Sequence, residues 1–317
     1  MKKKHDIVCM GLCGVDVSVM GVDFDLFFRQ EATKPLHTRL CVGGDAINQS
    51  MTLARLGHRV AFMGNVGNDD AGRCVRKCLE DQHVDTGFLR VRDDCVTSTV
   101  VLMVGENDDR HMCPSTDESS NRKFDLDNVD FEAFEGAGAV SFCSLFCFPL
   151  IDDAKLTEIF QRAKAAGALT FADNKLNQSM TFDRYRNAMR YLDYLFVNQD
   201  EAEFYSGKRN PEEIAAYFLK MGVGHVIVKL GGRGCYIADG AQSHYLSTFD
   251  VELVDTNGAG DNFAAGFISS ILRGFSFRES AVFATATAGL TVSSLGSSTG
   301  VRSMEQVEAF LATHTLK

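Results

Sequence analysis

The stretch DTNGAGD, which ends at Asp261, joins flexible backbone to a carboxylate. Gly258, Ala259 and Gly260 precede Asp261, and the apolar spacing that follows predicts a helix over 259–273. The first N–H groups of a helix have no partner inside it, so they attract anions. We therefore expect these amides to hold a nucleotide's terminal phosphate while Asp261 takes a proton from an alcohol as general base. The alternative is a tight turn in which Asp261 is only a helix N-cap.

A pair of glycines opens a second candidate site, in GGDAINQSMTLARLG. Gly43 and Gly44 stand before a predicted helix over 45–57, and residues without a side chain let a ligand approach the backbone closely. Asp45 and Asn48 are placed to bond hydroxyl groups of that ligand. The alternative is an ordinary glycine turn before a helix.

Polar residues also follow two predicted strands. Asp16 comes after the strand in 6–13, and ligands bind at the carboxyl ends of strands in open parallel sheets. A carboxylate accepts from two sugar hydroxyls at once, although Asp16 could equally cap the chain. Asn198 and Glu201 follow a later strand, where they would serve magnesium or phosphate through water or form a capping box.

The segment VKLGGRGCY predicts a strand, a glycine turn and a second strand. Gly231 and Gly234 would expose backbone to a nucleotide, with Lys229 or Arg233 as the cation. A plain hairpin turn explains the same pattern.

Strand-like and helix-like segments alternate along most of the chain, which predicts βαβ units and a mostly parallel sheet covered on both faces. Segments 34–44 and 95–114 break the alternation. The second has a hairpin pattern with its turn near 105–109, so we expect either a small β-flap over one sheet edge or an ordinary β-meander.

Composition excludes several classes of protein. The 317 residues carry a net charge of −10, which opposes broad binding to nucleic acid or to an anionic membrane. No apolar run is long enough to span a bilayer, and the amino terminus lacks a cleavage pattern. Ten cysteines without a CxxC pair predict reduced thiols, so we expect a cytoplasmic protein.

Two of these segments together resemble the signatures of the PfkB family, the ribokinase-like carbohydrate kinases. GGDAINQSMTLARLG followed by GNVGNDDAG is similar to the amino-terminal signature, and VDTNGAGDNFAAGF to the carboxyl-terminal one. The two lie about two hundred residues apart, in the order that the family shows.

The resemblance implies one α/β domain over 1–317, a three-layer α/β/α sandwich with a β-sheet lid formed by about 16–42 and 95–116. It implies a kinase that uses ATP and Mg²⁺, acts on a small sugar, and forms a homodimer through the lid. By position, the resemblance implies that Asp261 is the base, that Gly258, Ala259 and Gly260 form the anion hole, and that the substrate is held by Asp16, Gly43, Gly44, Asp45 and Asn48. It implies that the nucleotide is bound by Asn198, Lys229, Gly231 and Gly234, and that Glu201 holds Mg²⁺ through water. It also implies that a monovalent cation such as K⁺ is bound by Asp255 and Thr256 with the Gly296 loop.

Departures from the family bear on the acceptor. Asp45 disfavours an already phosphorylated sugar unless a lid cation such as Arg110 offsets its charge. The glutamate that helps ribokinases hold ribose is replaced by SFCSLFCFP, whose Phe142, Phe146 and Phe148 would stack a base or fill the core. FADNKLNQ does not match the family's D-x-N-x-R segment cleanly.

We therefore expect a kinase for a neutral monosaccharide. One alternative is a nucleoside kinase, since the asparagine of DTNGAGD also occurs in adenosine kinases. The other is a catalytically silent protein that binds sugar or nucleotide with the same fold.

Overall fold

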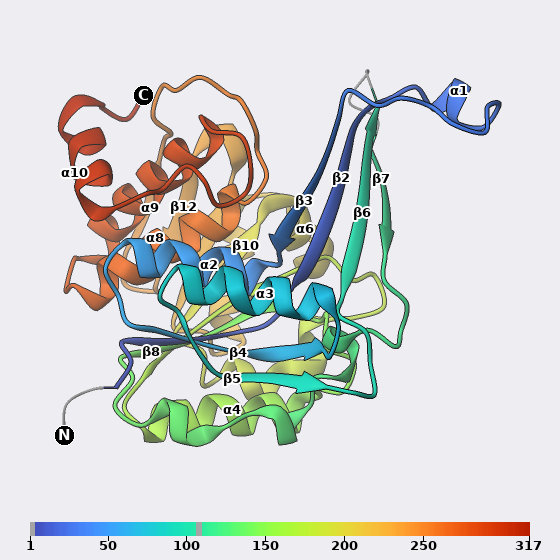
Figure 1. The fold of residues 1–317 in the computed structure, drawn as a ribbon. Helices are drawn as coiled ribbons and strands as arrows, with labels where there is room; N and C mark the ends of the chain where they lie inside the picture. The colour runs from blue at the N-terminus through green and yellow to red at the C-terminus, as the bar shows by residue number, and fades with distance from the viewer. Residues whose placement is uncertain (1–3, 106–109) are drawn as a thin grey trace.

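A nine-stranded sheet runs through the centre of the molecule, in a computed structural model that describes residues 4–105 and 110–317 (Figure 1). Its order is β13-β12-β11-β10-β9-β8-β1-β4-β5, and every pair is parallel except β11–β12 and β12–β13. The strands are β1 (Ile7–Met10), β4 (Val60–Gly67), β5 (Asp85–Arg92), β8 (Ala139–Leu145), β9 (Leu169–Asn174), β10 (Tyr194–Asn198), β11 (His225–Lys229), β12 (Cys235–Ala238) and β13 (Ser243–Leu246).

Helices cover both faces of this sheet. In β1, Ile7 and Cys9 pack into one apolar layer and Val8 and Met10 into the other, all without exposed surface, as is typical of strands buried on both sides. The first layer contains α2 (Asp45–Arg55), α3 (Asp70–Asp81), α8 (Ala259–Leu272) and α9 (Phe277–Val292), with α10 (Met304–Thr313) beyond α9; the second contains α4 (Asp153–Ala165), α5 (Arg186–Met189), α6 (Gln199–Ser206) and α7 (Pro211–Lys220).

These layers confirm the predicted three-layer α/β/α fold. The sequence pattern also predicts one helix over 181–190, but the structure has a 3-10 turn (Phe182–Tyr185) followed by the short helix α5. In the described parts of the chain, no helix combines the length and the apolar character that a bilayer crossing needs.

A second, four-stranded sheet stands out from one side of the body (Figure 1). Its order is β3-β2-β6-β7, and the short helix α1 (Phe24–Phe27) lies at its far end. The predicted hairpin is present as antiparallel β6 and β7, although the expected turn falls at 106–109, outside the described residues. That this sheet closes over a substrate stays a prediction. Its strands are β2 (Gly14–Val22), β3 (His37–Gly43), β6 (Thr99–Gly105) and β7 (Arg110–Pro114).

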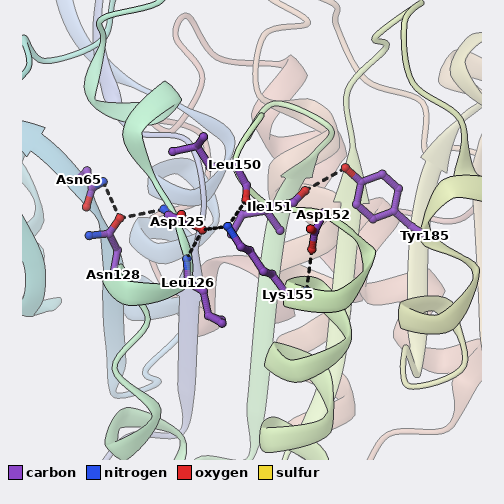
Figure 2. A network of polar contacts seen from close by, with 9 residues as sticks. All are labelled: Asn65, Asp125, Leu126, Asn128, Leu150, Ile151, Asp152, Lys155 and Tyr185. Carbon is purple, nitrogen blue, oxygen red and sulfur yellow. Dashed lines mark hydrogen bonds and ion pairs between the residues drawn. The ribbon is translucent and has the colours of Figure 1, made fainter.

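The chain after β7 is fixed to the central body by polar contacts (Figure 2). Asn128 Oδ1 accepts from the Asp125 backbone at 2.8 Å and from Asn65 Nδ2, on β4, at 3.2 Å. Lys155 Nζ, on α4, donates to Asp125 Oδ1 at 2.6 Å and to the Leu150 carbonyl at 2.8 Å. The segment that leaves the second sheet is therefore tied to both β4 and α4.

Candidate active site

Two adjacent amide side chains of α2 each hold a carboxylate from another element. Asn48 Nδ2 donates to Asp261 Oδ2 of α8 at 2.7 Å. Gln49 Nε2 donates to Asp173 Oδ2, at the carboxyl end of β9, at 2.6 Å. Asn48, Gln49 and Asp173 are at least nine-tenths buried, whereas Asp261 keeps some exposure. The start of α2 thus joins α8 to the central sheet at the end where parallel sheets bind ligands.

Asp45, one turn earlier on α2, has two partners of its own. Lys175 Nζ lies 3.1 Å from Asp45 Oδ1, and the Ser144 hydroxyl donates to Asp45 Oδ2. The Ser144 backbone N–H donates to Asp173, so one buried residue holds two carboxylates. Ser144 has a φ of 60°, a left-handed conformation that costs free energy in a non-glycine residue and is often found at functional sites.

Lys175, Asp173 and Ser144 were missed by the sequence reasoning. FADNKLNQ contains Asp173 and Lys175, but it has no glycine and no matching motif that would mark them as site residues. Only the arrangement of the folded strands shows that the end of β9 lies beside α2.

The carboxylates strongly affect one another's protonation. Burial raises the pKa of Asp261, and the charges of Asp45 and Asp173 raise it further. The hydrogen bond from Asn48 and the charge of Lys175 act in the opposite direction. Burial, followed by the charge of Asp45, likewise raises the pKa of Asp173. Asp261 and Asp173 therefore ionise at a higher pH than isolated carboxylates do.

Helix α8 begins without a side-chain cap. Its N-cap is Gly258, at φ 73°, which makes the alternative of Asp261 as N-cap wrong. A Cβ at Gly258 would lie 2.1 Å from the Ser297 carbonyl oxygen, so only glycine fits there. Ala259 and Gly260 form the first turn with Asp261. The Ala259 N–H donates to the Thr256 carbonyl at 3.3 Å, whereas the N–H groups of Gly260 and Asp261, in the same first turn, are available for an anion.

Lys229 supplies a cation at this helix end. A Cβ built on Gly260 would lie 3.0 Å from Lys229 Nζ, which brings the ammonium to the first turn of α8. The Arg233 guanidinium instead donates to Gln199 Oε1 of α6. Of the two cations that the sequence offered, Lys229 is the one beside the predicted anion hole.

The glycine pair allows a close approach to Asp16. A Cβ on Gly43 would lie 2.0 Å from Asp16 Oδ2, and one on Gly44, at φ 113°, would lie 2.3 Å from the Leu12 carbonyl oxygen. Burial raises the pKa of Asp16, while the charge of Lys175 lowers it. Asp16 therefore belongs to the same electrostatic cluster as Lys175.

The predicted nucleotide residues also have structural partners. Asn198 is the N-cap of α6, and its Oδ1 accepts from the Glu201 backbone at 2.8 Å. Burial raises the pKa of Glu201, and the charge of Lys229 lowers it, so this carboxyl lies within electrostatic reach of Lys229. A Cβ at Gly234 would lie 1.9 Å from the Leu246 carbonyl oxygen, whereas nothing lies within 4 Å of one at exposed Gly231.

Asp255 joins two loops beside the predicted anion hole. Its Oδ1 accepts from the Asn257 backbone and its Oδ2 from the Gly296 backbone, each at 2.9 Å. The Thr256 carbonyl accepts from Ala259 at 3.3 Å. Across residues 4–105 and 110–317, no three His, Cys, Asp or Glu side chains are grouped to hold a metal ion.

Comparison with known proteins identifies the family. The profile of the pfkB family carbohydrate kinases matches residues 4–304. This chain belongs to the PfkB family. It is therefore a kinase, a phosphotransferase for sugars or nucleosides, whose own acceptor is a separate question.

Relatives of this PfkB kinase have different acceptors. It is 28% identical over 283 residues to a 2-dehydro-3-deoxygluconokinase of Bacillus subtilis, covering 86% of each chain. It is 25% identical over 292 residues to a ribokinase of Haemophilus influenzae, covering 88% of this chain and 92% of the other. A crystal structure of a putative Ribokinase II from E. coli shares the fold, with a TM-score of 0.85, 22% identity and coverage of 98% and 100%.

Two expectations about this PfkB kinase's acceptor have different outcomes. Phe142, Phe146 and Phe148 are at most 5% exposed and pack in the core, so the core-packing alternative is right. Phe146 lies 4.7 Å, between ring centroids, from Phe182. The backbone of Arg110 is in β7, opposite Val104, but its side chain lies outside the described part of the structure.

Proposed function

We propose that this kinase transfers the terminal phosphoryl group of ATP to a hydroxyl of a small neutral monosaccharide. The observation that carries the proposal is the position of Asp261, in the first turn of α8 beside uncapped backbone donors, with its carboxylate held by Asn48. Asp261 accepts the proton of the acceptor hydroxyl, and its raised pKa makes it a stronger base than an exposed aspartate.

The donor side fits a nucleotide with Mg²⁺. The amides of Gly258, Ala259 and Gly260, with the ammonium of Lys229 beside Gly260, would neutralise phosphate charge at the start of α8. Glu201, with Asn198 beside it, would hold Mg²⁺ through water, while Gly231 and Gly234 would border the nucleotide. MgATP supplies the phosphoryl group and compensates the charge that develops on its oxygens.

The acceptor side favours a polyhydroxylated ligand. Asp16, Asp45 and Asn48 offer oxygen and amide groups near Gly43 and Gly44, where the backbone is accessible at close range. Together with Asp173 and Asp261 the cluster contains four carboxyl groups, and Lys175 is the cation paired with one of them. A phosphorylated sugar would bring further negative charge to this cluster.

One observation favours a second acceptor class, the sugar acids. The Lys175 ammonium contacts Asp45 through one of its three donors, and an acceptor carboxylate could pair with the others. The Bacillus subtilis relative, at 28% identity, is named for an acidic sugar, 2-dehydro-3-deoxygluconate.

An acceptor panel tests the proposal. Release of ADP from MgATP is measured with ribose, fructose, 2-keto-3-deoxygluconate, adenosine and inosine, and the phosphorylated product is identified by mass spectrometry. Turnover of a neutral sugar supports the proposal, and turnover of the sugar acid alone selects the second class. Turnover of nucleosides alone, or ligand binding without ADP release, contradicts both.

We also propose that the loop of Asp255 and Thr256 binds a monovalent cation such as K⁺ next to the anion hole. Its support is the hydrogen bond from the Gly296 backbone N–H to the Asp255 carboxylate, which holds the two loops next to each other. Replacing K⁺ by tetramethylammonium should lower turnover at saturating substrates. Equal rates in both salts would contradict this cation site.

A further inference from the structure

Asn262, the residue after the proposed base, is fully buried and connects four parts of the site. Its Nδ2 donates to the carbonyl oxygens of Gly258 and Ser297, each at 2.7 Å. Its Oδ1 accepts from the Thr52 hydroxyl of α2, and its backbone carbonyl accepts from Thr287 Oγ1 of α9 at 2.9 Å. One side chain therefore joins α8 to its own N-cap, to the loop after α9, and to α2.

The two carbonyls that share this amide lie at the most crowded point of the anion hole. The Ser297 carbonyl oxygen is the atom that a Cβ on Gly258 would approach to 2.1 Å. The Gly258 carbonyl also accepts from the Asn262 backbone N–H at 2.9 Å, whereas the Ser297 carbonyl accepts from the Asn262 side chain, and losing that donor in a buried site would cost free energy. The Asn262 amide supplies one donor to each and so fixes the distance between the Ser297 loop and the start of α8.

Asn262 is also coupled to the base through α2. Asn48 and Thr52 lie four residues apart on one face of that helix, and they bond to the adjacent residues Asp261 and Asn262. The Ser297 hydroxyl donates to Asn48 Oδ1 at 3.2 Å, which connects the same loop to the base's own partner. A shift of Asn262 would therefore move the anion hole and Asp261 together.

We propose that Asn262 is a positioning residue that sets the anion hole and the base in a common geometry. The inference rests on the proposed function of Asp261 and concerns Asn262 and Thr52, neither of which is a proposed contact of ATP or the acceptor. In phosphoryl transfer, catalysis depends on positioning, and a misplacement of about 1 Å can cost about 100-fold in rate. We refer to the contacts of Asn262 with Gly258, Ser297 and Thr52 as the Asn262 brace.

The brace is tested with Asn262→Ala and with the pair Thr52→Val and Thr52→Ser. Thr52→Val removes the hydroxyl donor at nearly constant volume, and Thr52→Ser restores it, so this pair remains informative if Asn262→Ala does not fold. The matched control is Ser270→Ala, a buried α8 position whose hydroxyl bonds only to carbonyls of its own helix, those of Gly266 and Phe267.

Three readouts are compared on each variant: kcat and KM for the acceptor, ADP affinity by calorimetry, and hydrogen exchange of the 258–262 amides without ligand. We expect Asn262→Ala and Thr52→Val to lower kcat about 10-fold or more with acceptor KM nearly unchanged, and to speed exchange at 258–262. Thr52→Ser should resemble the wild type.

Two outcomes would overturn the brace: rates and exchange that match Ser270→Ala, or faster exchange with unchanged kcat. If the wild type turns over no acceptor, the proposed function fails by itself. Exchange and ADP affinity then decide the brace: unchanged values overturn it, and faster exchange with weaker ADP binding supports it.

Discussion

The pKa of Asp261 results from opposing influences, and its raised value suits a base. Burial and the neighbouring charges of Asp45 and Asp173 disfavour its ionised form, whereas Asn48 and Lys175 favour it. A carboxylate with a raised pKa binds a proton more strongly, which an acceptor hydroxyl requires. The proposed role of Asp261 as base would explain why the folded protein retains this unfavourable charge cluster, as is common at functional sites.

Replacing Asp261 by Asn should separate activity from stability. We expect turnover to fall by about two to four orders of magnitude, because no group would take the hydroxyl proton. The raised pKa means that the folded state loses stability as the pH rises and Asp261 ionises. The melting temperature of Asp261→Asn should therefore be equal to or higher than that of the wild type, and the difference should grow as the pH rises through the neutral range. Near-normal turnover would remove Asp261 as the base.

The pH dependence of kcat/KM should report the carboxylate cluster. Because the pKa values of Asp261 and Asp173 are raised, activity should fall on acidification at a higher pH than for an isolated aspartate. Asp45→Asn removes a charge that raises both pKa values and frees Lys175, so it should move this acid limb to lower pH. An unshifted limb in Asp45→Asn would mean that another group controls it.

Replacing Lys229 should impair phosphoryl transfer from ATP, whereas replacing Arg233 should not. Lys229→Met removes the ammonium beside Gly260, and we expect kcat to fall about 100-fold, the usual effect of losing one electrostatic stabiliser. Arg233→Met, four residues away and bonded to Gln199, is the matched control. Steady-state kinetics with varied ATP measures both. Equal losses in the two variants would contradict the assignment.

At the scale of elements, periodicity in the sequence predicted most helices and strands of the central layers. α2 begins at Asp45 and α8 at Ala259, where glycines precede apolar spacing, as expected. α3 and β5 were not among the predicted elements. Contacts between elements were harder to predict from the sequence, because the residue spacing along one strand does not say which strand or helix lies beside it.

The candidate site shows the same limit. Asp261 and the glycine pair were recognisable because glycine next to a helix start is a local pattern. Lys175 and Ser144 were not, because their roles depend on β8 and β9 ending beside α2. That Asp261 is not the N-cap of α8 likewise required the position and backbone angle of Gly258.

The start of α8 should tolerate no side chain at its N-cap. Gly258→Ala places a Cβ at 2.1 Å from the Ser297 carbonyl oxygen, in addition to the strain of φ 73°. Gly274→Ala is the matched control, because Gly274 has φ 85° but nothing within 4 Å of its Cβ position. In both variants, backbone strain should lower the free energy of unfolding by about 1 kcal/mol or more. Gly258→Ala should lose clearly more stability than Gly274→Ala, and it should also lose activity. Equal melting temperatures and activities would contradict a crowded anion hole.

At the scale of the whole molecule, the second sheet presents an apolar face away from the site. Cross-strand registers place Val17, Leu40 and Val101 on the face opposite to that of Asp16. Leu40 is 65% exposed, and Val17 and Val101 are partly exposed. An exposed apolar face on a projecting sheet favours association. We therefore propose that the protein is a homodimer through this sheet.

Leu40→Glu should convert that dimer to a monomer, because a charge at the centre of an apolar interface loses its hydration without gaining a partner. Val91→Glu is the control, since Val91 is 49% exposed on β5 of the central sheet and lies outside the second sheet. Size-exclusion chromatography with light scattering measures the mass of each variant across a range of concentrations. A wild type that is monomeric at every concentration, or an unaffected Leu40→Glu dimer, would contradict association through this face. If the sheet also closes over the acceptor, the monomer should show a higher acceptor KM than the Val91→Glu protein, because closure would lose the support of the second subunit.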